Sequence, residues 1–134
     1  MPGWHGYDVG CMCEAPPVLD AVVAAMQAHG YSPRDCFGMR LCLEEALVNA
    51  VRHGNKEDPS KRVAVRYRVT QDGAVVEVED EGPGFDPDAV PDPLAPENLE
   101  KPSGRGLLLM RHYLTSVDFN GKGNCVTLRR CRSA

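Results

Sequence analysis

The segment LCLEEALVNAVRHGN, residues 41–55, carries two helical periodicities at once. Its apolar residues recur at the spacing of one buried helix face, which predicts a helix packed against a core. A second row, spaced at i, i+4 and i+8, carries an acid, an amide and an imidazole: Glu45, Asn49 and His53. A polar row is ordinarily a solvated face, so only further motifs elsewhere in the chain can indicate that this row is functional.

Composition limits the classes of protein that the chain can belong to. With 134 residues and 43% hydrophobic content, residues 1–134 are expected to form one domain that buries roughly two-thirds of its unfolded surface. A net charge of −4 argues against a dedicated nucleic-acid binder, because counterion release rewards a clustered basic excess. No stretch approaches the ~20 apolar residues of a membrane span, and MPGWHGYDVG does not resemble a signal peptide. We therefore expect a cytoplasmic protein with no direct nucleic-acid or membrane partner.

The six cysteines, at positions 11, 13, 36, 42, 125 and 131, form no CxxC pair. Two of them lie inside a helix-like apolar pattern, so the set is expected to be reduced thiols of a cytoplasmic protein. Cys11 and Cys13 could also join His5 as metal ligands, but CxC alone is a weak signal for a metal.

Two helices are predicted in the first half of the chain. Residues 16–29 form an amphipathic pattern that begins with prolines suited to a first turn and is closed by Gly30. Ser32 and Pro33 are typical of the N-cap and first position of a second helix, which is expected to run to His53 and stop at Gly54.

A hairpin follows, and it ends in an unusual acid. Residues 62–69 and 74–80 alternate apolar with charged residues around a turn at 71–73, so rows of Arg and Glu are expected to pair on one face. The same alternation turns Asp80 inward, where a carboxylate needs a partner. Gly82 and Gly84 follow directly, and glycine permits a ligand to approach the backbone closely.

The next segment, residues 86–103, has five prolines and little periodicity, which is typical of a lid or a linker. It leads into Gly104, Arg105 and Gly106, which open onto an apolar helical run. A glycine-rich entry to a helix offers unpaired N–H groups and the positive end of the helix dipole, both suited to phosphate. A turn at 120–123 then separates the last two predicted strands.

Three motifs in this order carry a family resemblance. EALVN (45–49) with HG after it, DEGPG (80–84) and GRGLLLMR (104–111) resemble the nucleotide-binding boxes of the GHKL ATPases, the fold shared by gyrase B subunits, histidine kinases and MutL-type repair proteins. The resemblance spans residues 16–130. The runs GFDP and SGRGLLLMR look most like bacterial anti-sigma-factor serine/threonine kinases. The resemblance to the GHKL ATPases implies an α/β two-layer sandwich with helices on one face of a mixed, mainly antiparallel sheet.

The resemblance also implies roles for the polar residues of the three motifs. Asn49 looks like the ligand of Mg²⁺, and Glu45, one turn earlier, looks like the general base beside the γ-phosphate of ATP. Asp80 resembles the adenine reader, which accepts a hydrogen bond from the exocyclic amine and so rejects guanine. Gly82 and Gly84 would leave room for the base and ribose.

Further residues would complete the ATP site. Backbone donors to the phosphates are implied for Gly104, Arg105, Gly106 and Leu107. The Arg105 side chain could add charge to the phosphates or cap the lid, and His53 could lie near the phosphates or serve only as a helix end. Related chains commonly have Thr in the last strand where this chain has Asn124, whose amide could still reach the adenine through water.

The function that the resemblance implies is phosphorylation of a serine or threonine on a small antagonist protein, by which a sigma factor is held or released. Two alternatives stay open: a non-catalytic module in which ATP orders the lid, and an ATPase subunit of a larger machine. The first helix has no basic residue between Pro16 and Gly30, where kinases of this family often use arginine to grip a sigma factor. The identity of the partner protein is therefore open, and so is the question of whether the chain forms a homodimer.

Overall fold

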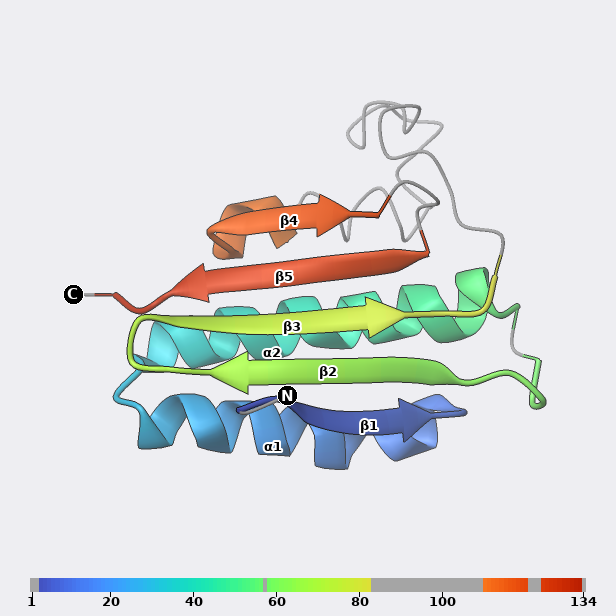
Figure 1. The fold of residues 1–134 in the computed structure, drawn as a ribbon, viewed down its shortest axis with the longest axis horizontal. Helices are drawn as coiled ribbons and strands as arrows, with labels where there is room; N and C mark the ends of the chain where they lie inside the picture. The colour runs from blue at the N-terminus through green and yellow to red at the C-terminus, as the bar shows by residue number, and fades with distance from the viewer. Residues whose placement is uncertain (1–2, 57, 83–109, 121–123, 134) are drawn as a thin grey trace.

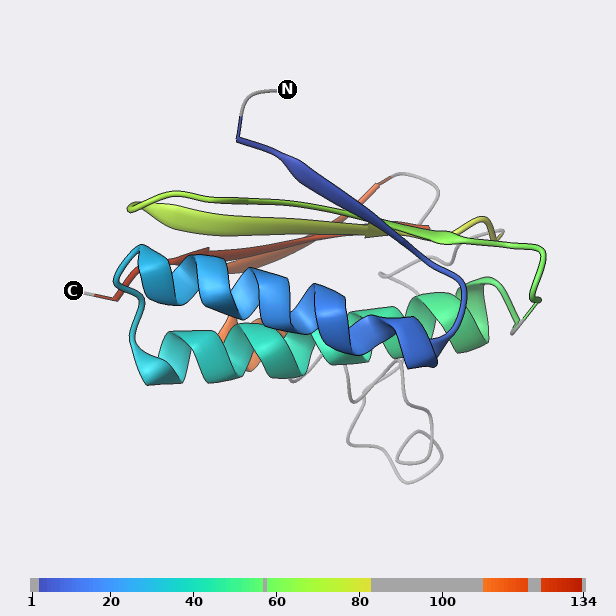
Figure 2. The same ribbon diagram turned by 90° about the horizontal axis from the view of Figure 1, so that it is seen from below.

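The computed structural model describes residues 3–56, 58–82, 110–120 and 124–133. In chain order its elements are β1 (His5–Val9), the 3-10 turn η1 (Met12–Glu14), α1 (Ala15–Ala28), α2 (Pro33–Val48), the π-helical segment η2 (Asn49–Gly54), β2 (Val63–Val69), β3 (Gly73–Glu79), β4 (Ser116–Phe119) and β5 (Cys125–Cys131). The strands form one sheet in the order β1-β2-β3-β5-β4, and α1 and α2 lie side by side on one of its faces (Figures 1 and 2). The predicted α/β two-layer sandwich is confirmed.

Helix α1 lies within one residue of its predicted bounds at both ends, and α2 begins at Pro33 as predicted. The second helix was expected to run to His53, but α2 ends at Val48 and the π-helical η2 continues it to Gly54. Helix α1 has prolines in its first turn, and Gly30 follows it with φ +80°, while the Tyr31 N–H donates to the Met26 carbonyl at 3.0 Å. At the start of α2 the Ser32 hydroxyl accepts a hydrogen bond from the Asp35 N–H at 3.1 Å. The local sequence therefore sets the end of α1 and the start of α2.

The sheet departs from the prediction at its first edge. Strand β1 was not predicted, because only Val9 of its five residues is buried and HGYDV shows no apolar alternation. Pairing with β2, from His5 opposite Tyr67 to Val9 opposite Val63, defines it instead. All four described strand pairings are antiparallel, where the prediction had allowed a mixed sheet.

The core lies between the two helices and the inner face of the sheet. It includes Val22, Met26, Leu43, Leu47, Val65, Val76 and Leu128, all with no exposed surface.

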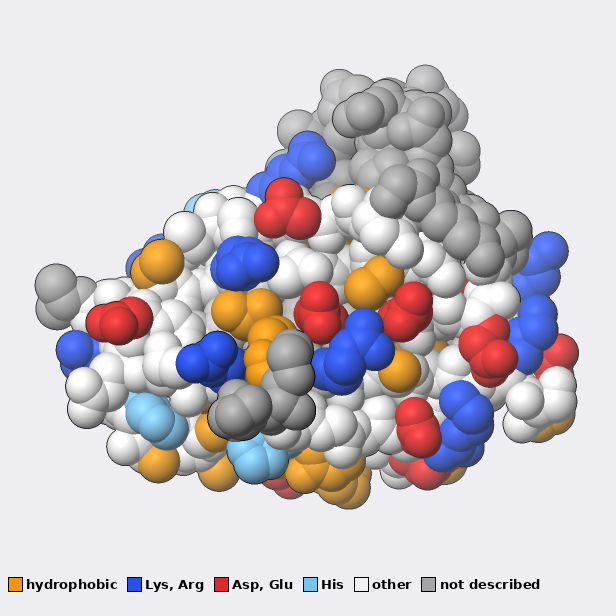
Figure 3. All heavy atoms as spheres, viewed as in Figure 1, with side chains coloured by type: hydrophobic (Ala, Val, Ile, Leu, Met, Phe, Trp, Pro, Cys, Tyr) orange, Lys and Arg blue, Asp and Glu red, His pale blue; other side chains and the backbone are white. Residues whose placement is uncertain are grey.

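On the opposite face of the sheet, Arg66 Nε and Nη2 donate to Glu77 and Glu79 at 3.1 and 3.3 Å, which confirms the predicted pairing across the hairpin. Figure 3 shows acidic and basic side chains interspersed on the open face of the sheet. Within the described residues no helix is long and apolar enough to cross a membrane.

Candidate functional site

The end of the second helix changes its hydrogen-bond pattern at the predicted catalytic row. Helix α2 is regular to Val48, and residues Asn49–Gly54 continue it as a π-helical segment. There the Asn55 N–H donates to the Ala50 carbonyl, five residues back, at 2.8 Å. A π turn inside or at the end of an α-helix often marks a functional site, because the wider turn shifts side chains out of the helical row.

Asn49 stands at the start of this π segment. Its side-chain oxygen Oδ1 is buried and has no hydrogen-bond partner among the described residues. An unsatisfied buried polar atom costs about 1–3 kcal/mol, so it is retained where something else needs it. A hard amide oxygen of this kind fits a Mg²⁺ ion, which takes oxygen ligands.

Glu45 lies one helical turn before Asn49 and is half-buried. Burial raises the pKa of its carboxyl above the usual value; the electrostatic interaction with His53 lowers that pKa in part, and the nearby carboxylate of Glu44 adds to the rise. The structure thus brings Glu45 and His53 within electrostatic reach of each other, although His53 itself is exposed. A raised pKa makes this carboxylate a stronger base than an exposed one.

Asp80 lies directly after β3 and is held there by Asn124. The Asp80 N–H donates to the Asn124 carbonyl, and the Asn124 amide Nδ2 donates to the Asp80 carbonyl, each at 2.9 Å. Asn124 therefore positions the main chain of Asp80 from the neighbouring strand. Its reach to adenine through water stays a prediction.

Two glycines let the end of the helical segment meet the end of β3, which lie together in both ribbon views (Figures 1 and 2). The carboxylate of Asp80 fills the space that a Cβ at Gly54 would need, and the Gly54 carbonyl fills the space of a Cβ at Gly82. The Gly82 N–H donates to Asp80 Oδ1 at 2.8 Å. The predicted need for glycine at position 82 therefore has a steric cause within the protein, in addition to any ligand.

Asn55 organises the same place and was missed by the sequence analysis. Its side chain is only 3% exposed; Oδ1 accepts a hydrogen bond from the Glu81 N–H at 2.7 Å, and Nδ2 donates to the Arg62 carbonyl at 3.0 Å. One amide thus joins the helix end, the start of β2 and the turn after β3. The available signal is a polar residue directly after Gly54, a glycine whose sequence context predicts only a helix stop.

Part of the predicted site lies outside the described residues: Gly84, the predicted lid 86–103, Gly104, Arg105, Gly106 and Leu107. Their roles toward the base, the ribose and the phosphates stay predictions.

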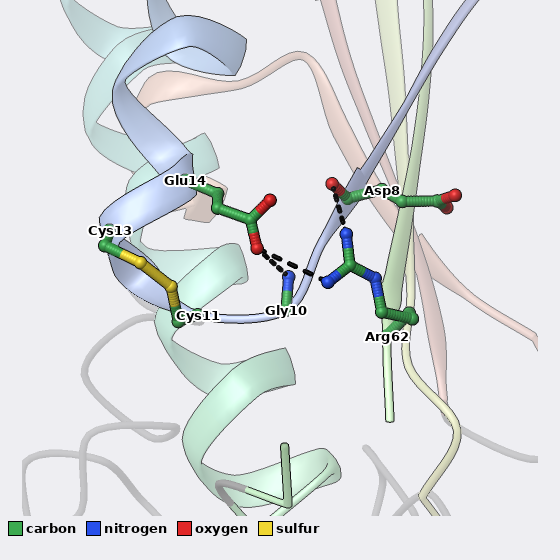
Figure 4. Close-up of a disulfide and its surroundings, with 6 residues drawn as sticks. All are labelled: Asp8, Gly10, Cys11, Cys13, Glu14 and Arg62. Carbon is green, nitrogen blue, oxygen red and sulfur yellow. Dashed lines mark hydrogen bonds and ion pairs between the residues drawn. A yellow bond between two sulfur atoms is a disulfide. The ribbon is translucent and has the colours of Figure 1, made fainter. Parts of the chain in front are cut away.

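The prediction that all cysteines are reduced is wrong for two of the six. Cys11 and Cys13 form a disulfide with their α-carbons 5.2 Å apart, within the range of ordinary disulfides (Figure 4). Residue spacing alone could not reveal this pair, since a CxC sequence fits thiols, a metal or a disulfide. His5, the third residue weighed with them as a metal ligand, stacks on Tyr67 with ring centroids 5.1 Å apart. In the described ranges no group of three His, Cys, Asp or Glu side chains could hold a metal ion.

Two helices pack on one face of an antiparallel sheet, an architecture that is consistent with a nucleotide-binding ATPase domain. A family model described as "Histidine kinase-like ATPase domain" matches residues 14–130. The chain therefore belongs to the histidine kinase-like ATPase family.

Three similar proteins have named activities. The chain is 34% identical over 95 residues to the serine-protein kinase RsbW of Bacillus subtilis, covering 66% of this chain and 59% of RsbW. It is 30% identical over 91 residues to the serine/threonine-protein kinase BtrW of Bordetella bronchiseptica, covering 66% and 64% of the two chains. It is also 28% identical over 100 residues to the anti-sigma F factor of Heyndrickxia coagulans, covering 71% and 67%. The match thus spans less than two-thirds of the length of RsbW and of BtrW.

Proposed function

We propose that this chain binds ATP with Mg²⁺ where α2 meets the end of β3, and transfers the γ-phosphoryl group to a serine or threonine of a small antagonist protein. By this transfer a sigma factor would be held or released. The observation that carries the proposal is the buried, unpartnered Oδ1 of Asn49, one helical turn after Glu45. The kinase and anti-sigma names of the similar proteins support it.

Asn49 would hold the metal through its side-chain oxygen. When bound, Mg²⁺ would neutralise charge on the phosphates and help to align them for transfer. The ligation would also satisfy the buried oxygen, so metal binding would remove a cost that the protein otherwise bears. This predicts a stability gain from Mg²⁺ and nucleotide that depends on residue 49.

Asp80 would select the base. A carboxylate accepts a hydrogen bond from the exocyclic amine of adenine but would face a carbonyl oxygen in guanine, and such a mismatch of polar groups is strongly rejected. Asn124 and the Gly82 N–H hold the residue in place from two sides. Recognition would therefore use a preorganised acceptor.

Glu45 would take the proton from the attacking hydroxyl. Its carboxyl is half-buried, and burial raises its pKa, which makes the carboxylate a stronger base. Its place on the same helix as Asn49 would keep the base and the metal ligand at a fixed separation.

The nucleotide part is tested by thermal unfolding of the full chain with Mg²⁺ and ATP, ADP or GTP. A nucleotide at ~100 times its Kd adds about 2.7 kcal/mol to the free energy of unfolding, so ATP and ADP should raise the melting temperature by several degrees and GTP should not. Asp80→Asn should remove the preference. Equal stabilisation by GTP would overturn the role of Asp80.

The transfer part is tested with ATP labelled at the γ-phosphate and a small antagonist protein encoded beside this chain in its genome. Label should appear on the antagonist and be lost when its target serine is replaced by alanine. Nucleotide binding without transfer to any such antagonist would favour the non-catalytic binding module instead.

A further inference from the structure

The Cys11–Cys13 disulfide lies in the connection between β1 and α1 (Figure 4). Cys11 is half-buried and Cys13 is exposed, so reagents in solution can reach the pair. A ring closed across one intervening residue constrains the unfolded chain very little, and it therefore gives little of the stability that long-range disulfides provide. The pair is poorly explained as a structural crosslink.

The residues on both sides of the disulfide form hydrogen bonds with each other and with an arginine that is distant in the sequence. Gly10, just before the ring, donates its N–H to Glu14 Oε1, just after it, at 2.9 Å. The same carboxylate oxygen lies 3.4 Å from Arg62 Nη1, while Arg62 Nη2 donates to the Asp8 carbonyl at 3.2 Å. Figure 4 shows the guanidinium bridging the two arms of the connection beside the disulfide.

From Arg62 the hydrogen bonds continue to the candidate site. The Arg62 N–H donates to the Glu81 carboxylate, and the Arg62 carbonyl accepts a hydrogen bond from Asn55 Nδ2. Asn55 Oδ1 accepts one in turn from the Glu81 N–H. A continuous path therefore runs from the disulfide to the turn that begins at Asp80.

We propose that Cys11 and Cys13 form a reversible redox site, oxidised by low-molecular-weight disulfides, and that closing the ring orders the path from Gly10 through Arg62 to Glu81. The three-residue ring fixes the direction in which Glu14 leaves the connection. In the dithiol form this constraint is gone, so the hydrogen bond from Gly10 to Glu14 and the contact between Glu14 and Arg62 become weaker.

The exchange is balanced in two steps. The thiolate of one cysteine, exposed Cys13 being the more accessible, attacks a sulfur of the small disulfide; the old S–S bond breaks, a mixed disulfide forms, and one small thiolate leaves and takes up the proton. The second cysteine thiolate attacks the protein sulfur of the mixed disulfide, forms the Cys11–Cys13 bond and releases the second small thiol. Two electrons pass from the two cysteine sulfurs to the small disulfide.

Three of the remaining described cysteines are poor competitors for oxidation. Cys36 and Cys42 are buried, and burial raises the pKa of the Cys42 thiol to about 12, which leaves almost no thiolate. Burial also raises the pKa of Cys125. Cys131 is exposed and free, so Cys131→Ser is the matched control for an accessible thiol outside the pair.

The first experiment equilibrates the full chain with reduced and oxidised glutathione in varied ratio, blocks free thiols and measures the mass of the peptide containing residues 11–13. The peptide should pass between dithiol and intramolecular disulfide in one reversible transition, and Cys131→Ser should not move its midpoint. A pair that stays reduced, stops at the mixed disulfide, or opens only when the protein is unfolded would overturn the redox site.

The second experiment measures amide hydrogen exchange in the oxidised chain, the reduced chain and the double variant Cys11→Ser/Cys13→Ser, without nucleotide. Exchange at Gly10, Arg62 and Glu81 should be several-fold faster in the reduced chain and in the double variant, while Val76 in the centre of the sheet should be unchanged. Equal exchange at all three amides in the three samples would overturn the ordering of the path. Neither experiment uses ATP, so their failure is separate from failure of the proposed kinase activity.

Discussion

The carboxylate of Asp80 lies against the α-carbon of Gly54, in the space that any side chain at position 54 would occupy. The end of β3 and the end of the helical segment can therefore meet only because residue 54 lacks a Cβ. Sequence periodicity treats this glycine as a helix stop, but its steric role connects the predicted base reader to the helix that carries Glu45 and Asn49.

Replacing Gly54 by alanine should displace Asp80 and damage the site. Overpacking of a close contact costs about 1–3 kcal/mol, and the displaced carboxylate should also lower the affinity for ATP. Urea unfolding and nucleotide titration measure the two effects. Gly6→Ala is the control, because a Cβ there meets only the Val65 carbonyl, at 3.8 Å. If Gly54→Ala and Gly6→Ala give the same unfolding free energy and the same affinity for ATP, the close contact between Gly54 and Asp80 is not needed for stability or for nucleotide binding.

Asn49→Ala should separate the stability of the free protein from that of the nucleotide complex. The substitution removes a buried oxygen that has no described partner, so the free protein should lose no more than about 1 kcal/mol and could gain stability. The same variant should lose the part of the nucleotide stabilisation that depends on Mg²⁺. Melting curves with ATP and either Mg²⁺ or a chelator test both statements, and retention of the full Mg²⁺ effect would exclude Asn49 as a ligand.

Local signals in the sequence predicted the helices and the central hairpin, because caps and alternation act within a few residues. Ser32, Gly30 and the valines of β3 are examples. Strand β1 was missed because its pairing partner, rather than its own apolar pattern, makes it a strand. The hydrogen bonds of Asn55 depend on segments brought together by the fold, and no periodicity in its own neighbourhood could indicate them.

The π-helical segment shows the same limit within the candidate site. The spacing of Glu45, Asn49 and His53 predicted one helical face, and Glu45 and Asn49 do lie one turn apart at the end of α2. Residues Asn49–Gly54 then follow a wider turn that side-chain periodicity does not encode. Periodicity can thus place residues on one predicted helix face, but it does not give the exact geometry of that face.

A buried ion pair ties the end of β5 to the start of α2 and gives a further prediction. Asp35, 2% exposed, accepts hydrogen bonds from Arg130 Nε at 3.0 Å and from Ser133 Oγ and N at 2.7 and 2.9 Å. Asp35→Ala leaves the half-buried charge of Arg130 without its carboxylate partner and should cost about 3–5 kcal/mol. The control is Asp20→Ala, which breaks a surface pair with Arg40 at 2.8 Å and should cost about 0–1 kcal/mol. Urea unfolding compares the two, and equal losses would contradict the prediction.

The pH dependence of this pair has a definite sign. Burial alone would raise the pKa of Asp35, but the hydrogen bonds from Ser133 and the charge and hydrogen bond of Arg130 outweigh it and hold the pKa below the usual value. A lowered pKa in the folded state stabilises the protein above the unfolded value of about 3.9, and this stability is lost as the pH falls through the folded pKa. The difference in unfolding free energy between wild type and Asp35→Asn should therefore shrink below about pH 4.

Glu45→Gln tests the general base, and its effect on stability has the opposite sign. Burial raises the pKa of Glu45, so the folded protein holds this proton more tightly than the unfolded chain, and the carboxyl becomes destabilising as the pH rises through the folded pKa. At neutral pH the uncharged Gln should therefore leave the protein at least as stable as wild type. A loss of activity in this variant could then not be attributed to unfolding.

The expected result for Glu45→Gln is normal affinity for ATP and slow transfer. Gln keeps the size of Glu but cannot accept the proton, and removal of a general base costs about 10²–10⁴ in rate. Single-turnover transfer from labelled ATP to the antagonist, with ATP affinity measured separately, compares wild type with Glu45→Gln. Glu44→Gln is the matched control, since that neighbouring carboxylate is exposed and should keep transfer near the wild-type rate. Transfer by Glu45→Gln at the wild-type rate would rule out Glu45 as the general base. A parallel loss of affinity and transfer would mean that Glu45 acts through nucleotide binding, because only a group acting in the transition state lowers the rate without changing the affinity.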